Sequence, residues 1–187
     1  MHSFYSGTLA GAGTFNCDSC GFPVALRERD EIPACPHCGE GRFVRASMFA
    51  PLGERIEAPE TESPDWLEEA RGALSADGDY VAYDNGERIR VMPLTDGFTR
   101  LGRSLSADVR FDDPTVSRRH AIFHRDDGRV KVIDDRSLNG VFVNGERRDW
   151  HELDDGDEVI VGRFRLYFIS LAGSRDRGSE GIGAAAR

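Results

Sequence analysis

The sequence lacks any apolar run long enough to cross a bilayer. Residues 1–15 also lack the basic start and the continuous apolar core of a secretory signal peptide. We therefore expect a cytoplasmic protein without a membrane partner, in a compartment where thiols stay reduced. Cysteine is scarce too, since the chain has four. In a reducing compartment these cysteines are expected to bind metal rather than to form disulfides.

Acidic residues outnumber basic ones, so the net charge is −9, and the chain has one lysine. This balance argues against a general nucleic-acid or membrane binder, which needs a basic face for phosphate groups. The charge is also uneven: residues 51–79 hold nine acids and two arginines, whereas residues 98–125 hold six arginines and three aspartates. The 23 arginines indicate a GC-rich bacterial genome. Their planar guanidinium groups also present paired N–H donors that suit oxyanions.

Catalytic motifs are missing as well. The chain has no nucleophile elbow, no phosphate-binding P-loop, no HExxH and no kinase signature. His120 and His124 lie close in sequence, but no cysteine or patterned serine accompanies them as a triad. We expect a protein that is not an enzyme.

The four cysteines form two CxxC pairs, Cys17–Cys20 and Cys35–Cys38, with fourteen residues between the pairs. Such spacing lets four thiolates surround one tetrahedral ion and leaves no open position for water, which predicts one structural zinc. His37 lies inside the second pair and is expected to be a surface residue rather than a ligand. The pattern resembles bacterial zinc ribbons, and we place this domain at residues 14–45.

A ribbon of this kind binds nucleic acid in some proteins and protein in others. Residues 14–45 carry four arginines and five acids, so a nucleic-acid-associated adaptor acting through the ribbon is the weaker alternative.

Residues 46–79 are acidic, contain three prolines and have few large apolar residues, which is typical of a flexible linker. One short helix is expected there, from Ser63 to Arg71, with Ser63 as the N-cap and Pro64 in the first turn. Its apolar side predicts either a helix docked on the neighbouring domain or a partner-binding motif. The glycine- and alanine-rich tail, residues 173–187, is expected to be disordered.

Residues 80–172 are predicted to be all-β. Asn-Gly or Asp-Gly pairs recur between short apolar stretches, for example at Asn85, Asp127 and Asp155, and they supply the positive φ angles of tight hairpins. Arg163–Phe168 alternates between polar and apolar side chains. Many strands at regular spacing indicate a sandwich or a barrel.

Three loops carry the informative motifs: Leu101-Gly102-Arg103, then Val116-Ser117-Arg118-x-His120, then Ser137-x-Asn139-Gly140 with Asn144-Gly145 beyond it. Their combination and order resemble the forkhead-associated (FHA) domain over about half of the chain. The resemblance implies a β-sandwich that binds phosphothreonine peptides at one end. It also implies phosphate contacts from Arg103, Ser117 and Arg118, and a hold on the peptide main chain by Asn139.

The same resemblance implies loop-shaping roles for Gly102, His120, Gly140 and Asn144, and a softer influence of Thr115 on peptide preference. Many family members have threonine where Leu138 stands. Leucine lacks that hydroxyl, so we expect only the Leu138 N–H to reach the phosphate. The alternative for Arg103 is a surface ion pair with Asp108, Asp112 or Asp113, and a degenerate FHA scaffold without phosphate binding remains open.

Taken together, these motifs predict a phosphothreonine-binding adaptor in Ser/Thr kinase signalling, whose partner is a kinase or a kinase substrate. Thr61 lies between two glutamates in the acidic segment. We expect that its phosphorylation would let the segment fold back onto Arg103, Ser117 and Arg118 and exclude other ligands.

Overall fold

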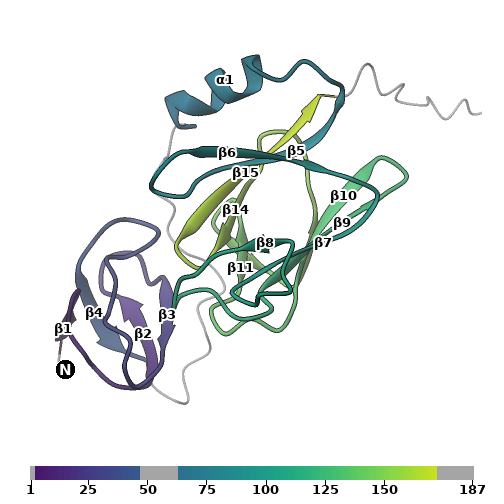
Figure 1. Ribbon diagram of the computed structural model, residues 1–187. Coiled ribbons are helices and arrows are strands. Elements are labelled where there is room, and N and C mark those ends of the chain that lie inside the picture. The colour runs from purple at the N-terminus through teal and green to yellow at the C-terminus, as the bar shows by residue number, and fades with distance from the viewer. Residues whose placement is uncertain (1–2, 47–62, 172–187) are drawn as a thin grey trace, which may run out of the picture.

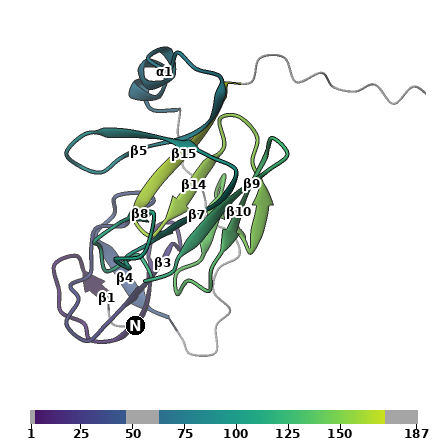
Figure 2. The same ribbon diagram turned by 45° about the vertical axis from the view of Figure 1, so that its right-hand side comes forward.

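The computed structural model describes residues 3–46 and 63–171. Within these ranges the chain is almost entirely β-structure with one short helix, as the sequence predicts. Figures 1 and 2 show a small sheet at one end of a larger sandwich and the helix at the other end. Residues 47–62, with Thr61, and the tail expected at 173–187 lie outside the described residues.

The small N-terminal sheet has the order β1-β4-β2-β3. Its strands are β1 (Ser3–Tyr5), β2 (Gly13–Cys17), β3 (Pro23–Leu26) and β4 (Arg42–Arg45). The expected boundary at Thr14 is too late, because β1 pairs with the outer edge of β4. At the opposite edge of the sheet, β3 pairs with β2, and no other strand among the described residues pairs with its outer edge.

The larger body is a sandwich of two sheets. One has the order β13 (Trp150–Glu152), β10 (Arg129–Asp134), β9 (Ala121–Asp126), β7 (Gly97–Gly102), β8 (Val109–Arg110). The other has the order β12 (Glu146–Arg148), β11 (Val141–Val143), β14 (Glu158–Val161), β15 (Phe164–Leu171), β5 (Gly78–Asp84), β6 (Ile89–Leu94). Alternate side chains from both sheets, such as Phe123 and Phe168, form the buried core between them.

The helix α1 (Asp65–Gly72) packs on the outer face of the six-stranded sheet. Leu67 is buried against Ala82 and Ile169, and the Trp66 ring meets the Tyr167 ring edge-on at 5.6 Å. The helix is therefore docked rather than free for a partner, and residues 63–79 belong to the sandwich rather than to a flexible linker.

The start of α1 differs from the expectation in one detail. Its N-cap is Pro64, not Ser63, and no side chain caps its first N–H groups. Asp65 and Glu68 instead place negative charge in the first turn, where the helix dipole favours it. At eight residues the helix is far too short for a bilayer, and no other described helix is a candidate membrane span.

The N-terminal sheet also packs on the outer face of the six-stranded sheet, beside β11 and β14. Phe142 and Ile160, opposite each other on those strands, are both fully buried, and they share one apolar cluster with Phe15, Phe22 and other N-terminal residues. The Phe22 and Phe142 ring centroids are 5.3 Å apart. The two bodies thus share an apolar cluster at their contact, separate from the core between the two sandwich sheets.

A polar contact lies beside this core. The Arg165 guanidinium donates to the carbonyl oxygen of His37 and also pairs with Glu158. His37 is buried, with its ring stacked on Phe22. The expectation that His37 is a surface residue is therefore wrong, because the residue lies in the contact between the two bodies.

Candidate functional site

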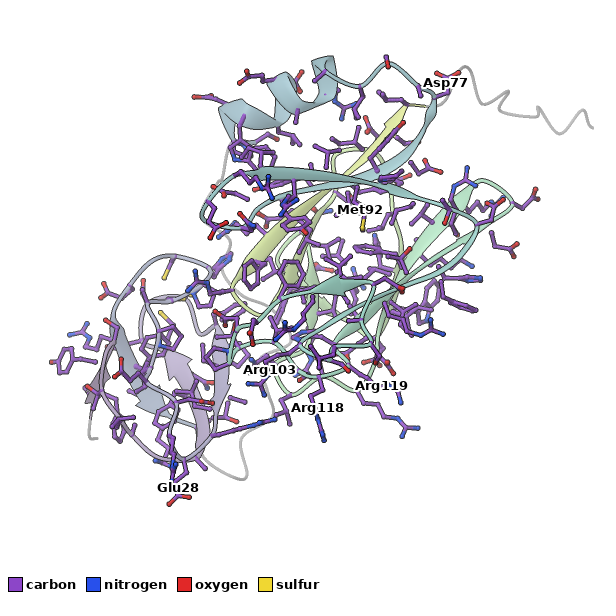
Figure 3. The ribbon with its side chains drawn as sticks, in the orientation of Figure 1. Glu28, Asp77, Met92, Arg103, Arg118 and Arg119 are labelled. Carbon is purple, nitrogen blue, oxygen red and sulfur yellow. The ribbon has the colours of Figure 1, made fainter. Side chains whose placement is uncertain are left out.

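Three loops of the sandwich meet beside β3 and enclose a pocket of about 490 Å³. They are residues 103–108 after β7, residues 111–120 before β9 and residues 135–140 before β11. All five residues that were expected to touch a phosphopeptide line this pocket: Arg103, Ser117, Arg118, Leu138 and Asn139. Figure 3 shows Arg103 where the two bodies meet, with Arg118 and Arg119 extending outward beside it.

The first two loops are held together through their main chains. The Arg103 N–H donates to the Ser117 carbonyl at 2.9 Å, and the Ser104 N–H donates to the Arg118 carbonyl at 3.1 Å. A Cβ atom on Gly102 would lie 2.2 Å from the Arg118 carbonyl oxygen. Glycine at position 102 is therefore what allows the two loops to approach so closely.

His120 ties the second loop to the third. Its ring is fully buried, its Nδ1 accepts the Ser117 N–H at 3.0 Å, and its Nε2 lies 3.1 Å from the Gly140 carbonyl oxygen. This pairing requires the tautomer in which Nε2 carries the proton and donates it. Burial lowers the pKa of His120, so the neutral ring is favoured. His120 thus links the second loop to the third and is not among the residues that line the pocket.

The Ser117 hydroxyl can still donate a hydrogen bond. Its Oγ accepts the Leu138 N–H at 3.0 Å, which leaves the O–H free to donate into the pocket. The Leu138 N–H, in contrast, is already engaged, so the expectation that it would reach the phosphate does not fit this arrangement. The Leu138 side chain is 61% exposed at the pocket rim.

Neither Arg103 nor Arg118 forms an ion pair within the described residues. The three aspartates considered as partners of Arg103 are engaged elsewhere, Asp108 by the Arg100 N–H, Asp112 by Arg110 and Asp113 by Arg163. The surface ion-pair alternative for Arg103 is therefore wrong. Arg119 differs, because its guanidinium forms a bidentate ion pair with Asp135, with Nε–Oδ2 and Nη2–Oδ1 distances of 2.7 and 2.6 Å.

Asn139 makes an unexpected contact. Its side chain is buried, its Oδ1 accepts the Ala25 N–H of β3 at 2.5 Å, and its Nδ2 donates to the Thr115 carbonyl at 2.7 Å. Asn139 does hold the main chain of an extended segment, but that segment is the unpaired edge of β3. The expected contact with a peptide main chain is thus replaced, in this structure, by a contact within the chain.

Thr115 lines the pocket, but its hydroxyl is engaged within the protein. The hydroxyl is buried, donates to Asp113 Oδ1 at 2.6 Å and accepts the Arg163 N–H at 2.9 Å. The influence of Thr115 on peptide preference therefore stays a prediction, although its one side-chain polar atom is engaged within the protein.

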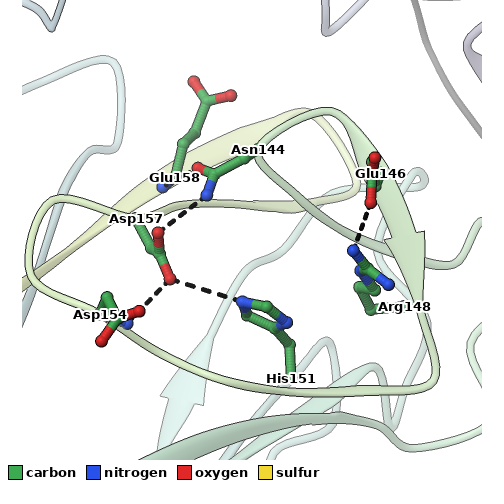
Figure 4. Close-up of polar contacts among 7 residues, drawn as sticks. All are labelled: Asn144, Glu146, Arg148, His151, Asp154, Asp157 and Glu158. Carbon is green, nitrogen blue, oxygen red and sulfur yellow. Dashed lines mark hydrogen bonds and ion pairs between the residues drawn. The ribbon is translucent and has the colours of Figure 1, made fainter.

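Gly140 and Asn144 adopt the positive φ angles that their turns require, 85° and 50°. Asn144 stands at the far end of β11 from Asn139. Its Nδ2 donates to Asp157 at 2.8 Å and its Oδ1 accepts the Glu158 N–H at 2.9 Å. Figure 4 shows this contact between the β11–β12 turn and the start of β14. Asn144 supports the turn, one strand away from the pocket.

The four cysteines converge in the N-terminal body, with all four sulfur atoms within 4.8 Å of one another. The Cys17–Cys38 and Cys20–Cys35 sulfur distances are 3.6 and 3.5 Å. Bonds of about 2.3 Å from a tetrahedral ion would place the sulfurs about 3.8 Å apart, whereas a disulfide needs about 2.0 Å. The site therefore fits a metal ion held by four thiolates, and His37 is not part of the cluster.

Sequence reasoning missed Ala25 and Arg27, which line the pocket from the N-terminal body. No motif marks them. A signal for the docking existed nevertheless, because Val141-Phe142-Val143 and Val159-Ile160-Val161 are unbroken apolar runs. A strand with one face in water alternates, so these runs indicate strands buried on both faces.

Models of known protein families match both bodies. The family model described as FHA domain matches residues 99–162, and the one described as zinc-ribbon containing domain matches residues 1–47. A solved structure from a study of phosphothreonine-dependent FHA domain interactions is 30% identical, covers 49% of this chain and 94% of its own, and has a TM-score of 0.46.

Two relatives are regulators rather than enzymes by name. The oxoglutarate dehydrogenase inhibitor of Corynebacterium diphtheriae is 42% identical over 113 residues, 55% of this chain and 79% of that protein. The glycogen accumulation regulator GarA of Mycolicibacterium smegmatis is 48% identical over 82 residues, 44% of this chain and 52% of that protein. The chain spans about half the length of GarA and of further relatives.

Proposed function

Because the chain belongs to the forkhead-associated family of phosphopeptide-binding regulators, we propose that its three loops bind phosphothreonine through Arg103, Ser117 and Arg118. The protein is an adaptor and not an enzyme. Its proposed partner is a Ser/Thr kinase, or a substrate of one, in the cytoplasm, with no role for a membrane or for nucleic acid.

The chemistry of the pocket supports this assignment. A phosphothreonine carries a charge of about −1.5 to −2 near neutral pH and three strong acceptor oxygens. Two guanidinium groups without ion-pair partners in the described chain, Arg103 and Arg118, and the free hydroxyl of Ser117 are donors suited to those oxygens. Leu138 offers an apolar surface to the peptide beside the phosphate.

The observation that carries the proposal is the charge of the pocket. Five arginines and one aspartate line it, which gives a formal charge of +4 in a protein whose net charge is −9. A strongly acidic protein that concentrates unpaired arginines in one concave site has a site built for an anion.

The test is a fluorescence-anisotropy titration of phosphothreonine peptides, with phosphoserine and unphosphorylated peptides for comparison. Each charge-assisted hydrogen bond is worth about 1.5–3 kcal/mol. Arg103→Ala should therefore weaken binding by about tenfold to 100-fold. Arg129→Ala is the matched control, because Arg129 is an exposed arginine of β10 outside the pocket.

Phosphate-dependent binding that Arg103→Ala weakens and Arg129→Ala leaves unchanged would support the proposal. A folded, metal-loaded protein that binds no phosphopeptide would instead point to the degenerate scaffold. Binding of nucleic acid by that protein would point to the adaptor that acts through the ribbon.

For the four cysteines we propose one structural zinc ion, held by Cys17, Cys20, Cys35 and Cys38. The closed set of four thiolates, three of them buried, supports a structural role, since it leaves no position for water or substrate. Elemental analysis of the purified protein should give one zinc per chain. Another metal, or a Cys35→Ser variant that melts at the wild-type temperature, would contradict this assignment.

Thr61 is proposed as a regulatory phosphosite whose modification blocks the pocket from within the chain. A tether raises the local ligand concentration to about the millimolar range. Phosphorylated protein should therefore bind external phosphopeptides more weakly, and Thr61→Ala should abolish the effect of kinase treatment. Unchanged affinity after stoichiometric Thr61 phosphorylation would exclude this regulation.

A further inference from the structure

We propose that the zinc ribbon is a fixed wall of the phosphopeptide pocket and that Arg27 reads an acidic side chain of the bound peptide. This inference rests on the proposed phosphopeptide function and adds a residue from a second domain to it. Arg27 follows β3 directly, lines the same pocket as Arg103 and Arg118, and is exposed.

The ribbon is held in place by an apolar cluster and by a buried hydrogen bond. Phe142 and Ile160 of the sandwich are fully buried in an apolar cluster that they share with ribbon residues. The Ala25 N–H donates to the buried Asn139 amide, two residues before Arg27. Burying two large apolar side chains stabilises the contact between the ribbon and the sandwich. The position of β3 beside the pocket is thus part of the folded structure.

Arg27 is held locally as well. Its own N–H donates to Asp30 Oδ2 at 2.9 Å, which closes the turn after β3. Its guanidinium has no hydrogen bond or ion pair within residues 3–46 and 63–171. The main chain of Arg27 is therefore positioned, while its charge remains available to a ligand.

The positive charge of the pocket exceeds what one phosphate needs. Arg103 and Arg118 balance a phosphate of about −1.5 to −2, and Arg119 is neutralised by Asp135. Arg27 and Arg136 remain, both exposed and both lining the pocket. A peptide with a carboxylate beside its phosphothreonine would complement this surplus, so the ligand class is an acidic phosphopeptide.

The chain contains its own control for Arg27. Arg29 lies two residues further on in the same turn, is also exposed, and does not line the pocket. Replacing either arginine by alanine changes the net charge of the ribbon equally. A difference between the two variants therefore reports position rather than overall charge.

The test uses the full, zinc-loaded chain and a set of nine-residue fluorescent phosphothreonine peptides. One peptide has only alanine, glycine and serine around the phosphothreonine, and the others carry a single aspartate at each position in turn. Wild type should bind one or two neighbouring aspartate peptides about three- to fivefold more tightly than the neutral peptide, the range of an exposed ion pair.

Arg27→Ala should erase this preference while the neutral phosphopeptide still binds more tightly than its unphosphorylated form, whereas Arg29→Ala should preserve the preference. Arg27→Glu should transfer the preference to lysine at the same peptide position. Equal aspartate preference in wild type and Arg27→Ala would overturn the inference while leaving the phosphate site intact. Tighter binding of all peptides by Arg27→Ala would also overturn the inference, since the ribbon would then compete with the peptide for the pocket. Absence of phosphate-dependent binding would overturn both proposals.

Discussion

The Asn139 side-chain oxygen accepts the backbone N–H of Ala25 at 2.5 Å, across 114 residues of sequence. The same amide donates to the Thr115 carbonyl at 2.7 Å. One buried side chain thus joins the ribbon edge, the loop before β9 and the loop before β11. Binding pocket and domain contact share a residue, so changes to one are expected to affect the other.

Asn139→Ala should destabilise the protein as a whole. It leaves the Ala25 N–H and the Thr115 carbonyl without their partner, and each unpaired buried group costs about 1–3 kcal/mol. Urea unfolding followed by tryptophan fluorescence measures the loss. Asn85→Ala, which removes only solvent-exposed turn contacts, should cost less. Equal losses in the two variants would show that the Ala25 contact contributes nothing.

Phe142→Ala should weaken the contact between the ribbon and the sandwich. The Phe142 ring is fully buried in the cluster shared by ribbon and sandwich, and truncating such a ring costs about 3–5 kcal/mol. Backbone ¹⁵N relaxation should then show two bodies that tumble at different rates, where wild type shows one. Phe98→Ala, at a 57% exposed phenylalanine, is the control. A single tumbling rate in Phe142→Ala would contradict the role given to this ring.

Leu138→Thr should strengthen phosphopeptide binding by about tenfold. The exposed Leu138 side chain lies at the pocket rim, where a threonine hydroxyl would add one charge-assisted hydrogen bond of about 1.5–3 kcal/mol. Leu138→Val introduces a side chain with the shape of threonine but without the hydroxyl, and it should keep wild-type affinity. Anisotropy titration of one phosphothreonine peptide measures all three proteins. No gain in the threonine variant over the valine variant would contradict the prediction.

His120 should make the stability depend on pH. Burial lowers its pKa in the folded protein below the usual value of about 6.5. As the pH falls below that value, the unfolded chain takes up a proton that the folded chain does not, so the free energy of unfolding decreases. The loss is at most about 1.4 kcal/mol per pH unit and ends at the pKa of the folded state.

Urea unfolding between pH 7.5 and pH 5 should therefore show a steeper fall for wild type than for His120→Gln. The variant lacks the titrating ring, although it is less stable at every pH because Ser117 and Gly140 lose their partner. Parallel curves for the two proteins would exclude His120 as the source of the pH dependence.

Much of the site could be predicted from the sequence because its elements are local. Two CxxC pairs bring four thiolates together wherever the hairpins lie, and the sulfurs do converge. The loop motifs around Arg103, Ser117 and Asn139 each sit at a strand end, and all three loops line one pocket. Turn pairs and alternation predicted a sandwich or a barrel, and the FHA resemblance selected the sandwich.

The errors share a cause. His37 was assigned to the surface and the Leu138 N–H to the ligand, and each is engaged by a partner distant in sequence, Arg165 and Ser117. Short-range patterns report which groups a segment offers. They do not report which distant segment satisfies those groups.

The sequence alone therefore determined the chemistry available: four thiolates for a metal, arginines for an anion, and two domains to carry them. Only the tertiary structure decided that the ribbon packs on β11 and β14, that Asn139 holds β3, and that Arg27 enters the pocket. Docking depends on the fit of two folded surfaces, and a surface is formed by residues that are neighbours in space rather than in sequence.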